Sequence, residues 1–271
     1  MKKRVFSFLL VALLALSLSA CGTKDGDKDN SLEYIEKNGK LILGLDDSFP
    51  PMGFRDDANN IVGFDIDLAQ AVADELGVEL VLQPVEWLAK EQELQTKNID
   101  CIWNGFSITE ERIEQLTLSI PYMGNTIAMV VVKDSDIKNK ADMAGKRLAV
   151  QGGSSAEETL NLDENKDFRE SLGEVNGSFK DYVTALMDLE TGNSDAVLMD
   201  SVVANYMIYE AGKDFVVLED SLVAEEYAIG FRKGDQKLAD RVNKALRDLK
   251  KDGTVEKISI KWFGSDNTII K

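Results

Sequence analysis

The chain has 271 residues, of which 31 are basic and 48 are acidic, so its formal net charge is −17. A protein this acidic repels polyphosphate, which argues against nucleic acid as a partner. The chain contains no histidine and so lacks the most common general base and transition-metal ligand. We therefore expect neither a metal site nor a cofactor. With 44% hydrophobic residues, the chain is long enough for two modest domains.

The first twenty residues have the pattern of an export signal. Basic residues at 2–4 precede an apolar run over 5–18 that is too short for a convincing membrane-spanning helix. The sequence LSACG at 18–22 resembles a bacterial lipobox, which implies lipid attachment and membrane anchoring through Cys21. The alternative is an ordinary secreted protein with a chance cysteine. The polar composition of residues 21–31 predicts a flexible tether.

Strands and helices are predicted to alternate through the next seventy residues. In chain order we expect a helix over 32–38, a strand over 40–45, a loop over 46–60, an extended segment over 61–64 leading into a helix that ends at residue 76, a strand over 79–84, a helix over 88–96 and a strand over 99–103. Such alternation is typical of βαβ units with a mainly parallel sheet. Cys101, in the last of these strands, is expected to be a small buried residue.

A second alternating unit follows a continuous apolar run. The elements expected there are a crossing strand over 127–132, a strand over 147–150, a helix after Ser155, a helix over 181–190, a strand over 196–199, a helix over 201–209, strands over 215–218 and 227–231, and helices over 236–250 and 254–262. We therefore expect a first lobe of residues 32–124 and 222–271, and a second lobe of residues 125–221.

The junction at residues 61–76 carries two acids at the start of its helix. Asp65 stands where an N-cap carboxylate would accept free backbone N–H groups. Asp67, in the first turn, would favour the positive end of the helix dipole. We interpret both acids as helix-capping residues, with direct ligand contact as the alternative.

Five sequence motifs stand in a characteristic order along the chain. They are LGLDDSFPPMGF at 43–54, GFDIDLAQAVADEL at 63–76, IDCIWNGFSITEER at 99–112, LAVQGGSS at 148–155 and SDAVLMD at 194–200. Together they resemble the extracellular solute-binding proteins of family 3, which serve ABC transporters of polar amino acids. The resemblance covers about residues 40–264 and implies an α/β fold of the periplasmic-binding-protein type II. In that fold two lobes, joined by two crossing strands, close on a ligand.

The resemblance also implies which residues hold the two charged groups of a free amino acid. The carboxylate would bind Arg112, Ser107 and the N–H of Ser155, because a guanidinium engages both oxygens and helix starts favour anions. The ammonium group would bind Asp200, the Gly105 carbonyl and the Ser107 hydroxyl. Each assignment has a structural alternative, with Arg112 on a helix surface and Asp200 or Ser155 as a helix cap.

The same resemblance places five residues around the variable side chain of the ligand. They are Asp46, Phe49, Trp87, Asn104 and Gln151. An acid beside two aromatic faces suits a cationic or strongly polar side chain, through charge pairing and cation–π attraction. The alternatives are that both aromatic residues belong to the core and that Asp46 holds its own loop by bonding to the backbone.

The implied function is the binding of a free polar amino acid by hinge closure. A lipid-anchored monomer on the extracellular or periplasmic face of the cell membrane would deliver the amino acid to the permease of an ABC importer, without enzyme activity. Two other classes stay open. One is an amino-acid sensor module, and the other is a dehydratase-like enzyme on the same fold, with Glu91 or Asp46 as acid or base.

Overall fold

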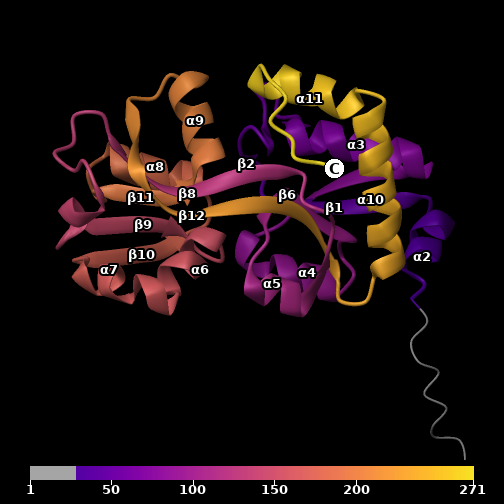
Figure 1. Ribbon diagram of the computed structural model, residues 1–271, viewed down its shortest axis with the longest axis horizontal. Helices are drawn as coiled ribbons and strands as arrows, with labels where there is room; N and C mark the ends of the chain where they lie inside the picture. Colours follow the sequence, from indigo (N-terminus) through magenta and orange to yellow (C-terminus); the bar gives the residue numbers. More distant parts are fainter. Residues whose placement is uncertain (1–28) are drawn as a thin grey trace, which may run out of the picture.

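The computed structural model describes residues 29–271 (Figure 1). The predicted export signal, Cys21 and most of the predicted tether lie outside the described residues. Between residues 29 and 271, none of the helices combines the length and apolarity that crossing a membrane requires.

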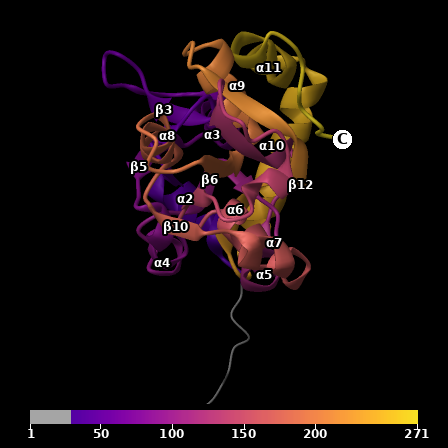
Figure 2. The ribbon, with the colours of Figure 1, turned by 90° about the vertical axis from the view of Figure 1, so that its left-hand side faces the viewer.

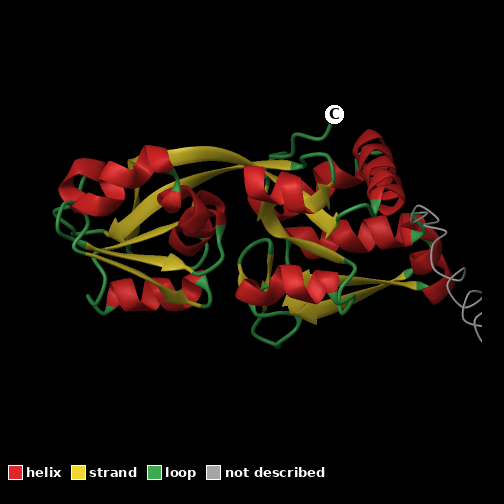
Figure 3. Cartoon of the chain, turned by 90° about the horizontal axis from the view of Figure 1, so that it is seen from below, coloured by secondary structure: helices red, strands yellow, loops and turns green. Residues whose placement is uncertain are grey.

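Two α/β lobes share one mixed sheet. Its strand order is β10-β9-β11-β8-β12-β6-β1-β5, and β7 also pairs with β12. The antiparallel strands β8 (Met123–Val132) and β12 (Phe215–Arg232) lie at the centre of this order. Seen from below, the lobes stand side by side and long strands connect them (Figure 3). The predicted fold class, two α/β lobes joined by two crossing strands, is confirmed.

In the first lobe, β1 (Lys40–Leu45) lies between β5 (Glu79–Pro84) and β6 (Cys101–Ser107) and is parallel to both. The other elements of this lobe are α2 (Ser31–Asn38), the small sheet β2 (Ser48–Phe49), β3 (Gly53–Arg55) and β4 (Ile61–Val62), α3 (Phe64–Leu76), η1 (Trp87–Ala89), α4 (Lys90–Gln95), α5 (Glu110–Gln115), β7 (Leu116–Leu118), α10 (Gln236–Lys251) and α11 (Thr254–Phe263). Figure 1 shows α3 and α11 above the sheet and α4 and α5 below it.

In the second lobe, β9 (Arg147–Gln151) lies between β10 (Glu174–Phe179) and β11 (Ala196–Asp200) and is parallel to both. The other elements are η2 (Lys140–Met143), α6 (Ser155–Asn161), η3 (Asp163–Asn165), α7 (Lys166–Ser171), α8 (Tyr182–Glu190) and α9 (Ser201–Tyr209). Figure 2 looks at this lobe from its end, with α9 near the top and α7 near the bottom.

Two of the inner strands, β6 and β11, are buried along their whole length. Every residue of β6 and of β11 is buried, as expected for strands covered by helices on both faces. Cys101 is fully buried in β6, which confirms its predicted position. Both strands end in polar residues, Ser107 and Asp200, so buried polar groups lie at the carboxyl ends of these strands.

Several elements differ from the prediction, among them β6 and β8, which cover residues 101–107 and 123–132, and the short elements β2, β3, α5 and β7, which were not predicted. Residues 215–232 form one strand, β12, instead of separate segments, because the pairing with β8 continues through polar residues. The helix α7 and the strand β10 were not predicted. β10 pairs only with β9 and is partly exposed, so its sequence EVNGSF lacks the apolar pattern of a buried strand.

The predicted capping role of Asp65 is wrong. The N-cap of α3 is Gly63, two residues before the predicted position, and Asp65 is fully buried in the first turn of the helix. Its Oδ2 accepts hydrogen bonds from the Gly105 N–H at 2.7 Å and from the Tyr122 hydroxyl at 3.0 Å. Burial raises the pKa of Asp65 to about 7. Asp65 therefore connects α3 to β6 and holds the peptide of Gly105.

Asp67 does lie in the first turn of α3, as predicted. Its Oδ2 accepts hydrogen bonds from Lys261 Nζ at 2.6 Å and from Trp262 Nε1 at 2.7 Å, both in α11. The second acid of the junction thus connects α3 to the last helix of the lobe.

Candidate functional site

The ends of four strands bring the predicted residues together. Ser107 ends β6, Gln151 ends β9 and Asp200 ends β11, whereas Asp46 follows β1 directly. The carboxyl ends of strands are where ligands bind in open α/β sheets. Gln151 Nε2 of the second lobe donates to Asp46 Oδ2 of the first at 2.9 Å. We call this region, where the two lobes meet, the interlobe site.

Arg112 is a buried cation of the interlobe site. It lies in α5 and is only 4% exposed, so the surface alternative for this residue is wrong. One terminal nitrogen donates to the Ser107 carbonyl at 2.9 Å, and the other donates to Glu158 of α6 at 3.0 Å. Its Nε is buried and has no hydrogen-bond partner among residues 29–271. The guanidinium therefore keeps a donor for a further acceptor.

Asp200 is a buried acid on the side of the second lobe. It directly precedes α9, but its carboxylate is held by three other donors. Tyr227 donates to Oδ1 at 2.6 Å, Asn125 Nδ2 to Oδ1 at 2.7 Å, and Tyr182 to Oδ2 at 2.9 Å. Burial, followed by the nearby charge of Glu225, raises the pKa of Asp200. The side chain thus acts as an acceptor in the interlobe site and not as a helix cap.

Glu225 is a member of the site that the sequence did not reveal. It lies on β12, and its Oε2 accepts hydrogen bonds from Ser107 Oγ at 2.6 Å and from Ser155 Oγ at 3.1 Å. The two serine oxygens are 3.2 Å apart. Burial raises the pKa of Glu225. It is one of two neighbouring acids in EEY at 225–227, a pattern that does not by itself indicate a binding residue.

The five predicted side-chain residues lie around the same place. Asp46 accepts from Ser48 N–H and from Gln151, and its own N–H donates to Asn104 Oδ1 at 3.0 Å. Burial raises the pKa of Asp46 to about 6. The backbone bond to Ser48 agrees with a role in holding the loop, but the bond to Gln151 extends that role across the lobes.

Both predicted aromatic residues are almost fully buried. The Phe49 ring lies 5.8 Å from the ring of Tyr182, which belongs to the other lobe. The Trp87 ring meets Phe106 edge-on at 6.1 Å, beside the ammonium group of Lys90. Phe49 therefore spans the two lobes, whereas Trp87 packs within the first lobe.

Comparison with known proteins identifies the family. The family model of the bacterial extracellular solute-binding proteins, family 3, matches residues 41–265. The chain belongs to this family.

Individual relatives agree with that assignment. The L-cystine-binding protein TcyJ of Escherichia coli is 31% identical over 96% of both chains. A structure of an ABC uptake transporter substrate-binding protein from Streptococcus pneumoniae with bound histidine is 38% identical, covers 89% of this chain and 98% of its own, and superposes with a TM-score of 0.84. The structure of Tv2483 bound to L-arginine is 27% identical, covers 90% and 98%, and has a TM-score of 0.83.

A buried lysine adds a further contact between the lobes of this solute-binding protein. Lys90 Nζ donates to the Gly153 carbonyl of the second lobe at 2.9 Å and to the Trp87 carbonyl at 3.2 Å, and it pairs with Glu91 at 3.0 Å. Burial, followed by the charge of Arg112, lowers the pKa of Lys90. Reasoning from the sequence missed this role, because a lysine at the start of a helix is ordinarily exposed.

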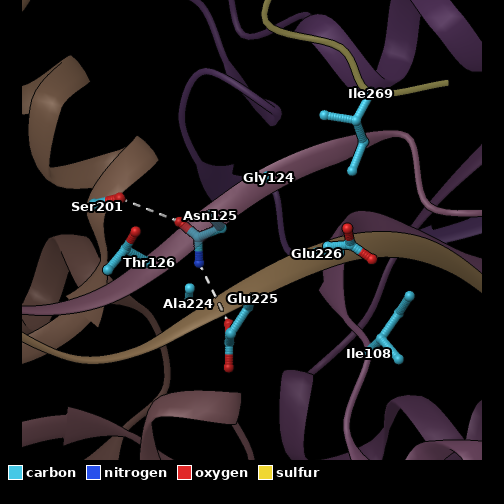
Figure 4. Close-up of a pocket in the computed structure, with 9 residues that line it drawn as sticks. All are labelled: Ile108, Gly124, Asn125, Thr126, Ser201, Ala224, Glu225, Glu226 and Ile269. Carbon is cyan, nitrogen blue, oxygen red and sulfur yellow. Dashed lines mark hydrogen bonds between the residues drawn. The ribbon is translucent and has the colours of Figure 1, made fainter.

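A pocket of about 740 Å³ lies against the crossing strands β8 and β12, but it is not the predicted ligand site. Its lining comprises Ile108, Gly124, Asn125, Thr126, Ser201, Ala224, Glu225, Glu226 and Ile269. Figure 4 shows Asn125 between Ser201 and Glu225. Arg112 and Asp200 are not among the lining residues, so only Asn125 and Glu225 belong to both this pocket and the interlobe site.

Proposed function

We propose that this protein binds a free amino acid in the interlobe site, with Arg112 holding the ligand's carboxylate and Asp200 its ammonium group. The observation that carries the proposal is a buried cation and a buried acid on opposite lobes, neither bonded to the other. Arg112 pairs with Glu158, but its buried Nε has no partner among the described residues, and a buried donor without an acceptor is costly. A zwitterion between the lobes would supply an acceptor to this donor and an opposite charge to Asp200. Ser107, Ser155 and Gly105 are the neutral partners in this proposal.

The mechanism that we propose is closure about β8 and β12. A ligand that contacts both lobes stabilises the arrangement in which they meet, through contacts that the open form lacks. Several hydrogen bonds between the lobes would then belong to the closed form. They include Gln151 to Asp46, Lys90 to Gly153, Arg112 to Glu158 and Ser155 to Ser107. An ABC importer would recognise this form.

The charges around the site favour a ligand with a cationic side chain. Four acids, Asp46, Glu158, Asp200 and Glu225, lie around the interlobe site, against the two cations Arg112 and Lys90, so the acids outnumber the cations even after an amino acid has contributed its own two charges. Asn104 and Gln151, together with the rings of Phe49 and Trp87, would complete the pocket for the ligand's side chain. One relative is named for cystine, and two similar structures contain bound histidine and L-arginine, which agrees with an amino-acid ligand and leaves its identity to experiment.

The cellular part of the proposal rests on the family and on the first residues of the chain. The family is extracellular, and we propose export by residues 1–20, lipid anchoring through Cys21 and delivery to a membrane permease by a monomer. We also propose that the protein transports its ligand unchanged, in contrast to a dehydratase-like enzyme or a sensor module.

A thermal-shift screen of the twenty common amino acids, cystine and ornithine tests the proposal. At about 100 times its dissociation constant, a ligand adds about 2.7 kcal/mol of stability, which raises the melting temperature by about 5 °C or more. We expect the largest shifts from amino acids with cationic or polar side chains, and recovery of the ligand unchanged by mass spectrometry. A screen without any shift would contradict amino-acid binding, and a chemically altered ligand would favour the enzyme.

A further inference from the structure

Glu225 lies at the centre of the hydrogen bonds between the two lobes. On β12 it is paired in register with Asn125 of β8. One carboxylate oxygen, Oε2, accepts from Ser107 of the first lobe at 2.6 Å and from Ser155 of the second at 3.1 Å. Asn125 Nδ2 lies 3.4 Å from the same oxygen (Figure 4). That amide also donates to Asp200 at 2.7 Å, so the two acids share one donor.

The bond to Glu225 decides what the Ser107 hydroxyl can offer a ligand. A serine hydroxyl has one hydrogen and two acceptor lone pairs. At 2.6 Å, the bond from Ser107 has the length of a charge-assisted O–H···O bond, so its hydrogen is directed to Glu225. The single hydrogen of Ser155 lies between two acceptors, Glu225 Oε2 at 3.1 Å and Ser107 Oγ at 3.2 Å, so it occupies at most one lone pair of Ser107. The remaining lone pair can only accept, and a ligand group beside it must therefore be a donor.

We propose that Glu225 is a positioning residue for the ligand's ammonium group. It turns an acceptor lone pair of the Ser107 oxygen toward the ligand, and it adds negative charge beside Asp200. This role rests on the proposed function and extends it to a residue on the crossing strand. The same charge disfavours the ligand's carboxylate at this position. The carboxylate is thereby directed to Arg112, whose Nε is free among the described residues. Glu225 thus determines the orientation in which the amino acid binds.

Amino acids and their des-amino analogues test this role. The pairs are L-arginine with 5-guanidinopentanoic acid, L-histidine with 3-(imidazol-4-yl)propanoic acid, and L-cystine with 3,3′-dithiodipropanoic acid. Affinities are measured by calorimetry, and those of weak ligands by competition against the bound amino acid. We expect Glu225→Met to lower the affinity for the amino acid by about tenfold or more and to leave that for its analogue within about threefold. Equal losses for both members of a pair overturn the role.

The matched control is Glu226→Met, at the exposed neighbour on the same strand. We expect it to keep the wild-type ratio of the two affinities. A ratio lowered as strongly by this control as by Glu225→Met overturns the specific role of Glu225. Wild-type protein that binds none of the amino acids overturns the proposed function itself, which is a different result from equal losses.

A double-mutant cycle covers the case in which Glu225→Met does not fold. Glu225→Gln removes the charge but retains an amide of the same length, and Ser107→Ala removes the hydroxyl that Glu225 orients. Because Glu225 acts partly through that hydroxyl, we expect Glu225→Gln to reduce amino-acid affinity less in the Ser107→Ala background than in the wild type. Strictly additive effects overturn the coupling and with it the role.

Discussion

Replacing Asp65 by asparagine should flatten the pH dependence of the protein's stability. Burial raises the pKa of this carboxyl from 3.8 to about 7. Between those values the unfolded chain releases the proton while the folded protein retains it, so the free energy of unfolding falls as the pH rises. At about 1.36 kcal/mol per pKa unit, the loss between pH 4 and pH 8 amounts to about 4 kcal/mol. Asparagine cannot ionise and should not show this loss.

Urea unfolding at pH 4, 6 and 8 measures the effect as the difference between wild type and Asp65→Asn. The comparison with wild type is needed because other buried acids with a raised pKa, such as Asp46, also make the protein less stable as the pH rises. As a control, Asp67→Asn removes the negative charge that pairs with Lys261 of α11 but keeps the buried carboxyl group of Asp65, and with it the loss of stability that Asp65 causes between pH 4 and pH 8. Parallel curves for wild type and Asp65→Asn would refute the reasoning.

Three further substitutions test other parts of the structure. Arg112→Ala should weaken amino-acid binding by about 3 kcal/mol, because it removes a buried charge, and unchanged affinity in calorimetry would contradict the site. Tyr182→Phe should lower the free energy of unfolding by about 1–3 kcal/mol, since Asp200 loses a donor at 2.9 Å; an unaltered denaturation curve would argue against that bond. Gly63→Ala should lower the free energy of unfolding by about 1–3 kcal/mol, because the φ of Gly63 is 150° and a Cβ there would overlap the Met52 carbonyl oxygen. A wild-type melting temperature in scanning calorimetry would contradict this strain.

The sequence by itself determined most elements of the fold. The strand at residues 40–45 and the helix at residues 201–209 have the predicted bounds, because the period of the apolar residues reports local backbone geometry and burial. The ordered motifs also predicted the family correctly. An edge strand such as β10 escaped prediction because it buries too little surface to show a pattern.

Only the tertiary structure decided which polar groups meet. Asp65 had the sequence pattern of a helix cap, yet it bonds to Gly105 and Tyr122, which lie 40 and 57 residues away. Glu225 meets Ser107 across 118 residues, and Lys90 reaches Gly153 across 63. Such partners depend on strand register and on how the lobes meet. A polar side chain carries no periodic signal for a distant partner, and a buried one must find its hydrogen bonds wherever the folded chain provides them.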